Sequence, residues 1–187
     1  ITSFYGRKFF ALYTGKEDDE EKEIIRNIYN GELDKIPVSL KNDIIRYFYN
    51  DDPSKIPKKN NLYGELIQLL IISSSGAEGI DLKNVRYVHI MEPYWHPVRI
   101  EQVIGRAKRI CSHKDLPDEL QNVKVFMYLL VHNQRFIKEK GEALSQIINI
   151  DTDENGDVTS TDEKLYNIMM NKKLLMGEFL TAIKEAS

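Results

Sequence analysis

Residues 66–82 have the sequence LIQLLIISSSGAEGIDL, in which an apolar run passes directly into a loop rich in serine and glycine. The run Leu66–Ser73 predicts a buried strand, because near-continuous apolar character is typical of parallel strands that are covered on both faces. Ligands of open α/β sheets bind at the carboxyl ends of such strands. The loop Ser73–Leu82 can therefore hold phosphate through hydroxyls and exposed amides, although a simple strand-to-helix turn fits the same residues.

The segments on either side of this stretch alternate between strands and helices. The sequence predicts strands at Phe9–Tyr13, Val85–Met91 and Val123–Val131, and helices around Ile24–Tyr29 and at Pro97–Ile110, Phe136–Ile148 and Asp162–Ala186. This alternation predicts an α/β fold with a mainly parallel sheet flanked by helices. We expect one domain over residues 1–187, with a long C-terminal helix within 160–187 whose start is capped by Ser160–Asp162.

Residues 31–62 differ in character from the rest of the chain. They contain several prolines and an Asn-rich tract around one helical candidate, Leu40–Tyr49. Because prolines and asparagines punctuate regular structure, we interpret this segment as an insertion into the framework.

Composition limits the classes of function. The chain has a net charge of −3, which argues against coating nucleic acid by bulk electrostatics, so any such contact must be local, as in the basic stretch Arg99–Lys114. No run of eighteen apolar residues and no signal-peptide pattern occurs, so we expect no membrane partner. The single cysteine, Cys111, cannot form an internal disulfide, which fits a reducing intracellular compartment, cytoplasmic or nuclear.

Residues 102–109 have the sequence QVIGRAKR, of the form Q-x-x-G-R-x-x-R. On the predicted helix, Gln102, Arg106 and Arg109 lie three and four residues apart and share one face. Gly105 allows another backbone or a ligand to come close. Two guanidinium groups on one face form an anion clamp of the kind that phosphoryl transfer requires, although a surface helix with ordinarily spaced arginines fits the pattern too.

The two stretches 73–82 and 102–109, in this order and spacing, resemble motifs V and VI of superfamily 2 helicases. Trp95-His96-Pro97 precedes the second stretch much as the W-N-P of Snf2-type ATPases does, and Tyr29-Asn30 is similar to their phenylalanine-asparagine pair. The sequence of Glu92–Pro97 looks most like that of helicases of large nucleocytoplasmic DNA viruses. Cys111-Ser112 departs from the glycine-glutamine that often follows motif VI, which puts a place among chromatin remodellers in doubt. The resemblance implies the second RecA-like lobe of a superfamily 2 or Snf2-type helicase.

The resemblance also implies roles for individual residues. Arg106 and Arg109 match arginine fingers that reach the γ-phosphate of ATP, and Asp81 matches a position that senses the nucleotide. The remaining residues fall into two groups: Gln102, Gly79 and Gly105 at the nucleotide interface, and Ser73, Ser74 and Trp95 as contacts to nucleic acid. Hydroxyl contacts to phosphate position a strand without reading its sequence.

The cofactors and partners implied by the resemblance lie partly outside this sequence. Neither a G-x-x-x-x-G-K-[ST] motif nor a D-E-x-H motif occurs, so we expect ATP and Mg²⁺ to be bound mainly by a missing N-terminal RecA-like lobe of the same protein. The expected partners are that lobe, a DNA or RNA backbone and, through residues 31–62, other transcription or virion proteins; a viral protein would also be packaged in virions. A non-catalytic docking module that retains the lobe fold is the alternative.

Three further features have a functional and a structural interpretation. Asp151–Val158, with Asp162 at the last position, nearly fits a calcium-binding EF-hand loop, but the shorter Asp at the last position weakens a calcium site, and we favour an acidic turn that caps the last helix. Cys111 and the histidines lack the paired spacing of a zinc site, which predicts no metal. The indole of Trp95 can stack on a base or pack beside its neighbouring prolines.

Overall fold

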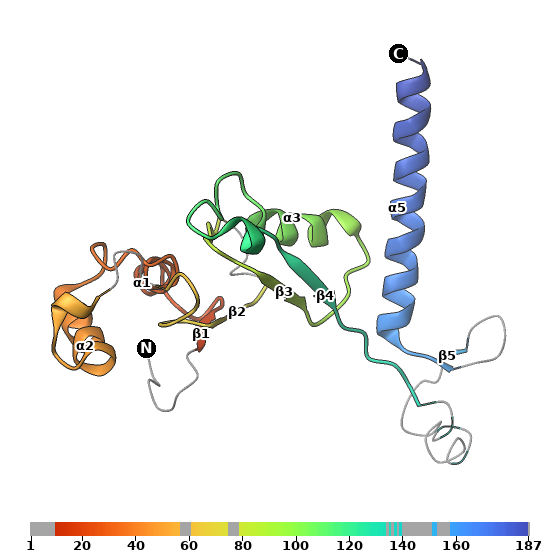
Figure 1. Ribbon diagram of the computed structural model, residues 1–187. Helices are drawn as coiled ribbons and strands as arrows, with labels where there is room; N and C mark the ends of the chain where they lie inside the picture. The colour runs from red at the N-terminus through yellow and green to blue at the C-terminus, as the bar shows by residue number, and fades with distance from the viewer. Residues whose placement is uncertain are drawn as a thin grey trace. The chain divides into compact units, whose positions relative to one another are not determined.

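The computed structural model describes residues 10–56, 61–74, 79–133, 135, 137, 139, 151–152 and 158–186 (Figure 1). The chain divides into two compact units. The first unit comprises Ile1–Arg86 and Gly105–Lys124, and the second comprises Tyr87–Ile104 and Val125–Ser187. The predicted helix Phe136–Ile148 lies almost wholly outside the described residues, as does most of the calcium-like loop, residues 153–157.

The first unit is built on a pair of parallel strands. Strand β1 (Phe10–Tyr13) pairs with β2 (Leu69–Ile72), with Phe10 opposite Leu69 and Tyr13 opposite Ile72. Between them the chain forms helix α1 (Asp19–Tyr29), helix α2 (Val38–Tyr49) and a 3-10 turn (Pro53–Lys55), and a second 3-10 turn (Asp118–Leu120) follows later. The strand-helix-strand order is that predicted for a parallel sheet.

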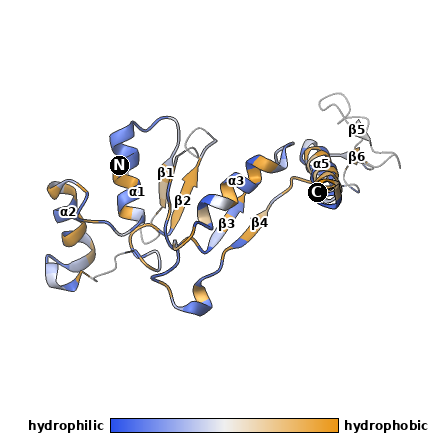
Figure 2. Ribbon diagram, turned by 90° about the horizontal axis from the view of Figure 1, so that it is seen from above, coloured by the Kyte–Doolittle hydropathy of each residue, from blue (hydrophilic) through white to orange (hydrophobic). Residues whose placement is uncertain are grey.

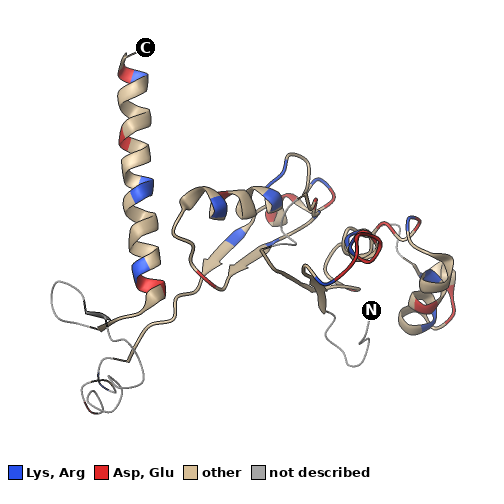
Figure 3. Cartoon of the chain, turned by 180° about the vertical axis from the view of Figure 1, so that it is seen from behind, with Lys and Arg blue, Asp and Glu red and all other residues tan. Residues whose placement is uncertain are grey.

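Helix α1 begins within the acidic run Glu17–Glu21, just before the first apolar positions of the helix. The Asp18 carboxylate accepts a hydrogen bond from the amide of Glu21 at 2.8 Å and caps the helix. The acidic first turn, red in Figure 3, also faces the positive end of the helix dipole. Further along the helix, Ile25 and Ile28 are buried. The acidic run is therefore a helix start.

Strand β2 is shorter and more exposed than predicted. The buried residues of the run, Leu66 and Ile67, precede the strand, because their amides both donate to the side-chain oxygen of Asn61 at 2.8 Å. Within the strand, Leu69 is 50% exposed and Ile71 is 44% exposed, and β2 is an apolar strand in Figure 2. The prediction of a strand covered on both faces is wrong for this chain, since β1 is the one strand that pairs with β2 among the described residues.

The segment 31–62 contains one helix and several buried apolar residues. The helical candidate predicted at Leu40–Tyr49 is confirmed as α2, whose buried residues are Ile44 and Ile45. Leu33 and Ile36, which precede the helix, are also buried. The helix ends at Asn50, whose φ of 50° is in the left-handed region that terminates helices. The interpretation of this segment as an insertion stays a prediction.

The second unit contains another pair of parallel strands. The pair is formed by β3 (Tyr87–Ile90) and β4 (Lys124–Met127). The amide of Lys124 donates to the carbonyl of Arg86, and that of Tyr128 donates to the carbonyl of Ile90, both at 2.9 Å. The bonds advance in the same direction along both strands, so the pairing is parallel. One face exposes stacked rings, with the His89 and Phe126 centroids 5.2 Å apart.

Helix α3 (Pro97–Ala107) and helix α5 (Thr161–Ala186) follow the predicted pattern. The last residues of α3, from Gly105, belong to the first unit. At the start of α5, Ser160 and Glu163 form a capping box: the Ser160 hydroxyl accepts from the Glu163 amide at 3.0 Å, and the Ser160 amide donates to the Glu163 carboxylate at 2.7 Å. Strands β5 (Asp151–Thr152) and β6 (Val158–Thr159) form an antiparallel pair before it.

The predicted α/β fold, with small parallel sheets flanked by helices and a long C-terminal helix, is confirmed. The described strands pair as separate two-stranded sheets, however, and not as one sheet. Among the described helices, none combines the length and the apolar character that a membrane crossing requires.

Candidate functional site

The two predicted arginines lie on either side of the C-terminal end of helix α3. The helix was predicted to continue to Ile110, but it ends at Ala107. Cys111 adopts a φ of 61°, and the Ser112 hydroxyl donates to the carbonyl of Ala107 at 3.4 Å. These features turn the chain away from the helix axis. Arg109 therefore lies in a turn beyond the helix, and the prediction that it shares a helix face with Arg106 is wrong.

Both arginines nevertheless meet the same short segment. A guanidinium nitrogen of Arg109 lies 3.0 Å from the carboxylate of Asp81, and Arg106 donates to the carbonyl oxygen of Ile80 at 3.4 Å. The side chain of Ile80 is buried and anchors the segment, whereas Asp81 is exposed. Two cations thus converge on two consecutive residues of the loop that follows β2.

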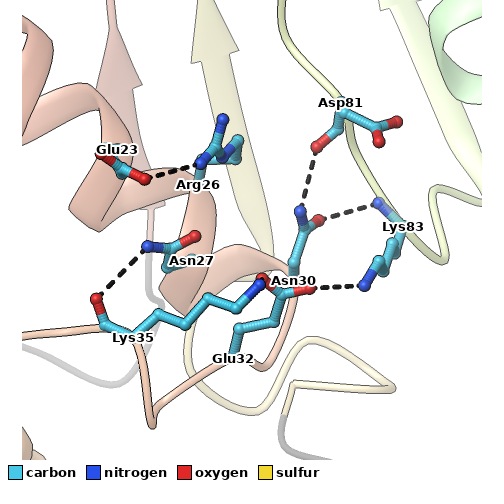
Figure 4. A network of polar contacts seen from close by, with 8 residues as sticks. All are labelled: Glu23, Arg26, Asn27, Asn30, Glu32, Lys35, Asp81 and Lys83. Carbon is cyan, nitrogen blue, oxygen red and sulfur yellow. Dashed lines mark hydrogen bonds and ion pairs between the residues drawn. The ribbon is translucent and has the colours of Figure 1, made fainter.

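The segment after Ile80 is attached to the end of α1. The side-chain amide of Asn30 donates to the carbonyl of Asp81 at 3.0 Å, and its oxygen accepts from the amide of Lys83 at 2.9 Å (Figure 4). The ammonium group of Lys83 also pairs with Glu32, which pairs with Lys35 at 2.8 Å. The Lys35 and Lys83 hydrogen bonds hold the pKa of the Glu32 carboxyl below its ordinary value.

Asn30 was not among the residues to which the sequence assigned a role. A signal was available, because the Tyr29-Asn30 pair carried part of the family resemblance. Its contacts with Asp81 and Lys83 join residues far apart in the chain, which spacing alone cannot reveal.

The two predicted glycines differ in what their positions require. Gly79 has a φ of 75°, a conformation that residues with a side chain rarely adopt, and a Cβ there would contact nothing within 4 Å. The left-handed backbone conformation explains why position 79 is a glycine, because there is room for a side chain. Gly105 is exposed on α3 with no atom within 4 Å of an added Cβ, so the predicted close approach is not seen among the described residues.

The other predicted residues are distributed over both units. Ser73 and Ser74 directly follow β2, and Ser74 is exposed, whereas Ser75–Glu78 lie outside the described residues. In the second unit, Gln102 is exposed on α3. Trp95 is 45% exposed, and the ammonium of Lys172 lies 3.7 Å from the centroid of its ring. The structure therefore places a cation against one face of the Trp95 ring.

The electrostatic character of the segment suits an anion. The Asp81 carboxylate pairs with Arg109, which offsets its charge, and Arg106 donates to the neutral carbonyl of Ile80. No group of three or more potential metal ligands is found among the described residues. Because a guanidinium group stays ionised and binds anions through planar paired donors, Arg106 and Arg109 can bind phosphate oxygens when they exchange their present partners.

Comparison with known proteins matches residues 51–111 to the helicase conserved C-terminal domain. The putative ATP-dependent RNA helicase R350 of Acanthamoeba polyphaga mimivirus is 40% identical over 129 residues, which are 69% of this chain and 14% of the relative. The termination factor NPH-I homolog of African swine fever virus is 35% identical over 178 residues, which are 95% of this chain and 20% of the relative.

A third relative extends the comparison to insect poxviruses. The nucleoside triphosphatase I of Amsacta moorei entomopoxvirus is 33% identical over 95 residues, which are 51% of this chain and 14% of the relative. The chain thus spans at most 20% of the length of these relatives. No solved structure matches it. Asp81, Arg106 and Arg109 lie inside the matched domain, and Asn30 lies outside it.

Proposed function

The chain contains a helicase C-terminal lobe that resembles the helicases of large DNA viruses, and from this premise we propose that it is the second lobe of an ATP-dependent nucleic-acid helicase or translocase. The observation that carries the proposal is the convergence of Arg106 and Arg109 on Ile80–Asp81. Two guanidinium groups held at one loop supply the positive charge that phosphoryl transfer needs.

In this proposal the arginines act on ATP bound mainly by the other lobe, together with Mg²⁺. Arg109 exchanges the Asp81 carboxylate for a phosphate oxygen, and Arg106 exchanges the Ile80 carbonyl. Both exchanges favour the phosphate, because a triphosphate carries more negative charge than one carboxylate or a neutral carbonyl. The arginines therefore stabilise the charge that develops on the transferring phosphoryl group.

Nucleic acid is proposed to bind through the residues that follow β2. The hydroxyls of Ser73 and Ser74 would contact backbone phosphates, which positions a strand of DNA or RNA without reading its sequence. Because Asp81 belongs to the same loop, a change in its pairing with Arg109 would also move the residues that hold the strand. Closure on ATP and reopening after hydrolysis would then move the lobes along the nucleic acid.

The names of the relatives include a termination factor and RNA helicases of viruses. On this basis we place the activity in viral transcription or DNA transactions. The residues 31–62 offer a surface for other transcription or virion proteins.

The test uses the full-length protein with Arg106→Ala. We expect nucleic-acid-stimulated ATP hydrolysis to fall by roughly 10³-fold or more, since arginine fingers contribute about that much to turnover. Lys108→Ala is the matched control, because it removes one positive charge from the exposed residue two positions away, outside the contacts with Ile80 and Asp81. Undiminished hydrolysis in a folded Arg106→Ala protein would reject the catalytic lobe and favour the docking module instead.

A further inference from the structure

The side chain of Asn30 bridges the backbone on both sides of Leu82. Its nitrogen donates to the carbonyl of Asp81 at 3.0 Å, and its oxygen accepts from the amide of Lys83 at 2.9 Å. We propose that Asn30 is a positioning residue for Arg109, because it holds the backbone that presents the Asp81 carboxylate. The proposal rests on the proposed function, since it concerns the geometry of the same arginine.

The chemistry of the bridge requires a carboxamide. One side chain must donate to a carbonyl and accept from an amide within three consecutive residues, and asparagine provides both groups on a short, stiff side chain. An aspartate of the same size keeps the acceptor for Lys83 but, when ionised, has no proton to donate to the Asp81 carbonyl. At position 30, asparagine can therefore form both hydrogen bonds, whereas an ionised aspartate of almost identical shape can form only one.

Asn30 is itself firmly held. Its amide donates to the carbonyl of Arg26 at 2.9 Å as the last bond of α1, and Ile28 just before it is buried. The carbonyl of the adjacent Tyr29 accepts from the side chain of Asn61 at 2.7 Å. The bridge is thus anchored on a helix end whose own backbone is satisfied, which makes it a rigid support.

Among the described residues, Asn30 is the side chain that bonds to the backbone of Asp81. Gly79, two residues earlier, has a left-handed φ of 75°, and the Asp81 side chain is 54% exposed. The neighbours Ile80 and Leu82 are buried, but burial of neighbours does not set where an exposed carboxylate points. In Figure 4 the Asn30 side-chain amide lies between the Asp81 carbonyl and the Lys83 amide and bonds to both.

The contacts form a chain from α1 to the arginine. The helix end holds Asn30, Asn30 holds the Asp81 backbone, and the Asp81 carboxylate holds Arg109 at 3.0 Å. Arg109 must be held beside the nucleotide before it exchanges Asp81 for a phosphate oxygen, so a small movement of Asp81 would reduce turnover without abolishing ATP binding. Asn30 therefore acts on kcat through Asp81 and does not touch the nucleotide.

The experiment compares Asn30→Asp and Asn30→Ala with Asn27→Ala in the full-length protein. Asn27 lies on the same helix and is buried, but its side chain donates to the carbonyl of Lys35 and not to the Asp81 segment. We expect both Asn30 variants to lower kcat of nucleic-acid-stimulated ATP hydrolysis by about tenfold, with KM for ATP within about twofold of the native value. Asn27→Ala should lower the melting temperature and leave kcat per folded molecule unchanged.

A second comparison identifies the route of the effect. In an Asp81→Ala background, Asn30→Ala should cause little further loss of kcat, because residues that act through one another are not additive. A full tenfold further loss would overturn the proposal, and so would a loss of turnover that is wholly explained by the unfolded fraction at the assay temperature. Arg109→Ala, assayed in parallel, distinguishes failure of the proposed function from failure of the Asn30 proposal. If Arg109→Ala hydrolyses ATP normally, the proposed function itself fails, whatever the Asn30 variants do.

Discussion

The guanidinium of Arg109 lies 3.0 Å from the carboxylate of Asp81, although Arg109 stands beyond the end of α3 and Asp81 follows β2. The two side chains are 42% and 54% exposed, so solvent screens the pair and its contribution to folding is at most about 1 kcal/mol. The pair matters for position, because it keeps the Arg109 guanidinium at the loop to which Arg106 also donates a hydrogen bond.

Asp81→Asn tests this view directly. The substitution keeps the size of the side chain but weakens its hold on Arg109, so we expect the free energy of unfolding to change by less than about 1 kcal/mol while kcat of the full-length ATPase falls roughly tenfold. Urea unfolding and steady-state hydrolysis measure the two quantities. Asp43→Asn, which breaks the exposed pair with Arg46, is the control and should alter neither. Native turnover in Asp81→Asn would show that the pair has no role in positioning.

The Glu32 carboxyl predicts a pH dependence of stability. Its pKa is lowered, first by the hydrogen bond from Lys35 and then by that from Lys83. The folded state therefore favours the ionised form, and this stabilisation is present above the ordinary value of 4.5 and is lost as the pH falls through the folded pKa. The free energies of unfolding of native protein and Glu32→Gln, measured in urea, should converge in acid and differ by about 1 kcal/mol or less at neutral pH. A constant difference at every pH would contradict the assignment.

Asn61 predicts a large loss of stability on substitution. It is buried, accepts from the amides of Leu66 and Ile67, and donates to the carbonyls of Tyr29 and Ile67. Asn61→Ala leaves buried backbone groups without partners, which costs about 2–4 kcal/mol by thermal or urea unfolding.

Asn61→Gly is the informative companion, because the native φ of 55° suits glycine better than alanine. It should be less harmful than Asn61→Ala by about 1 kcal/mol, yet still well below native stability. Equal stability of Asn61→Gly and native protein would mean that the hydrogen bonds contribute nothing.

Ser160 predicts a smaller effect at the start of α5. Ser160→Ala removes the hydroxyl that accepts from the Glu163 amide, so we expect a loss of about 1 kcal/mol in thermal unfolding. Thr161→Ala changes the neighbouring hydroxyl inside the helix and should cost less. If the two variants melt together, the capping box does not support the helix.

Local sequence patterns predicted the order of strands and helices, and also the loop and the arginines of the candidate site. Apolar periodicity and turn residues are local properties, so the strand Phe10–Tyr13, the helix over residues 38–49 and the long last helix could be predicted from neighbours in the chain alone. The family resemblance likewise depended on spacing along the chain.

Contacts in the folded chain set the ends of those elements and bring particular side chains together. The helix that carries Arg106 ends at Ala107, where the Ser112 hydroxyl donates to the last carbonyl. The amides of Leu66 and Ile67, which precede β2, bond to Asn61 and not to a strand. Asn30 reaches Asp81 across a long stretch of intervening chain. Such contacts depend on the packing of distant segments, whose free energy is not a property of any local window, and so no periodicity could reveal them.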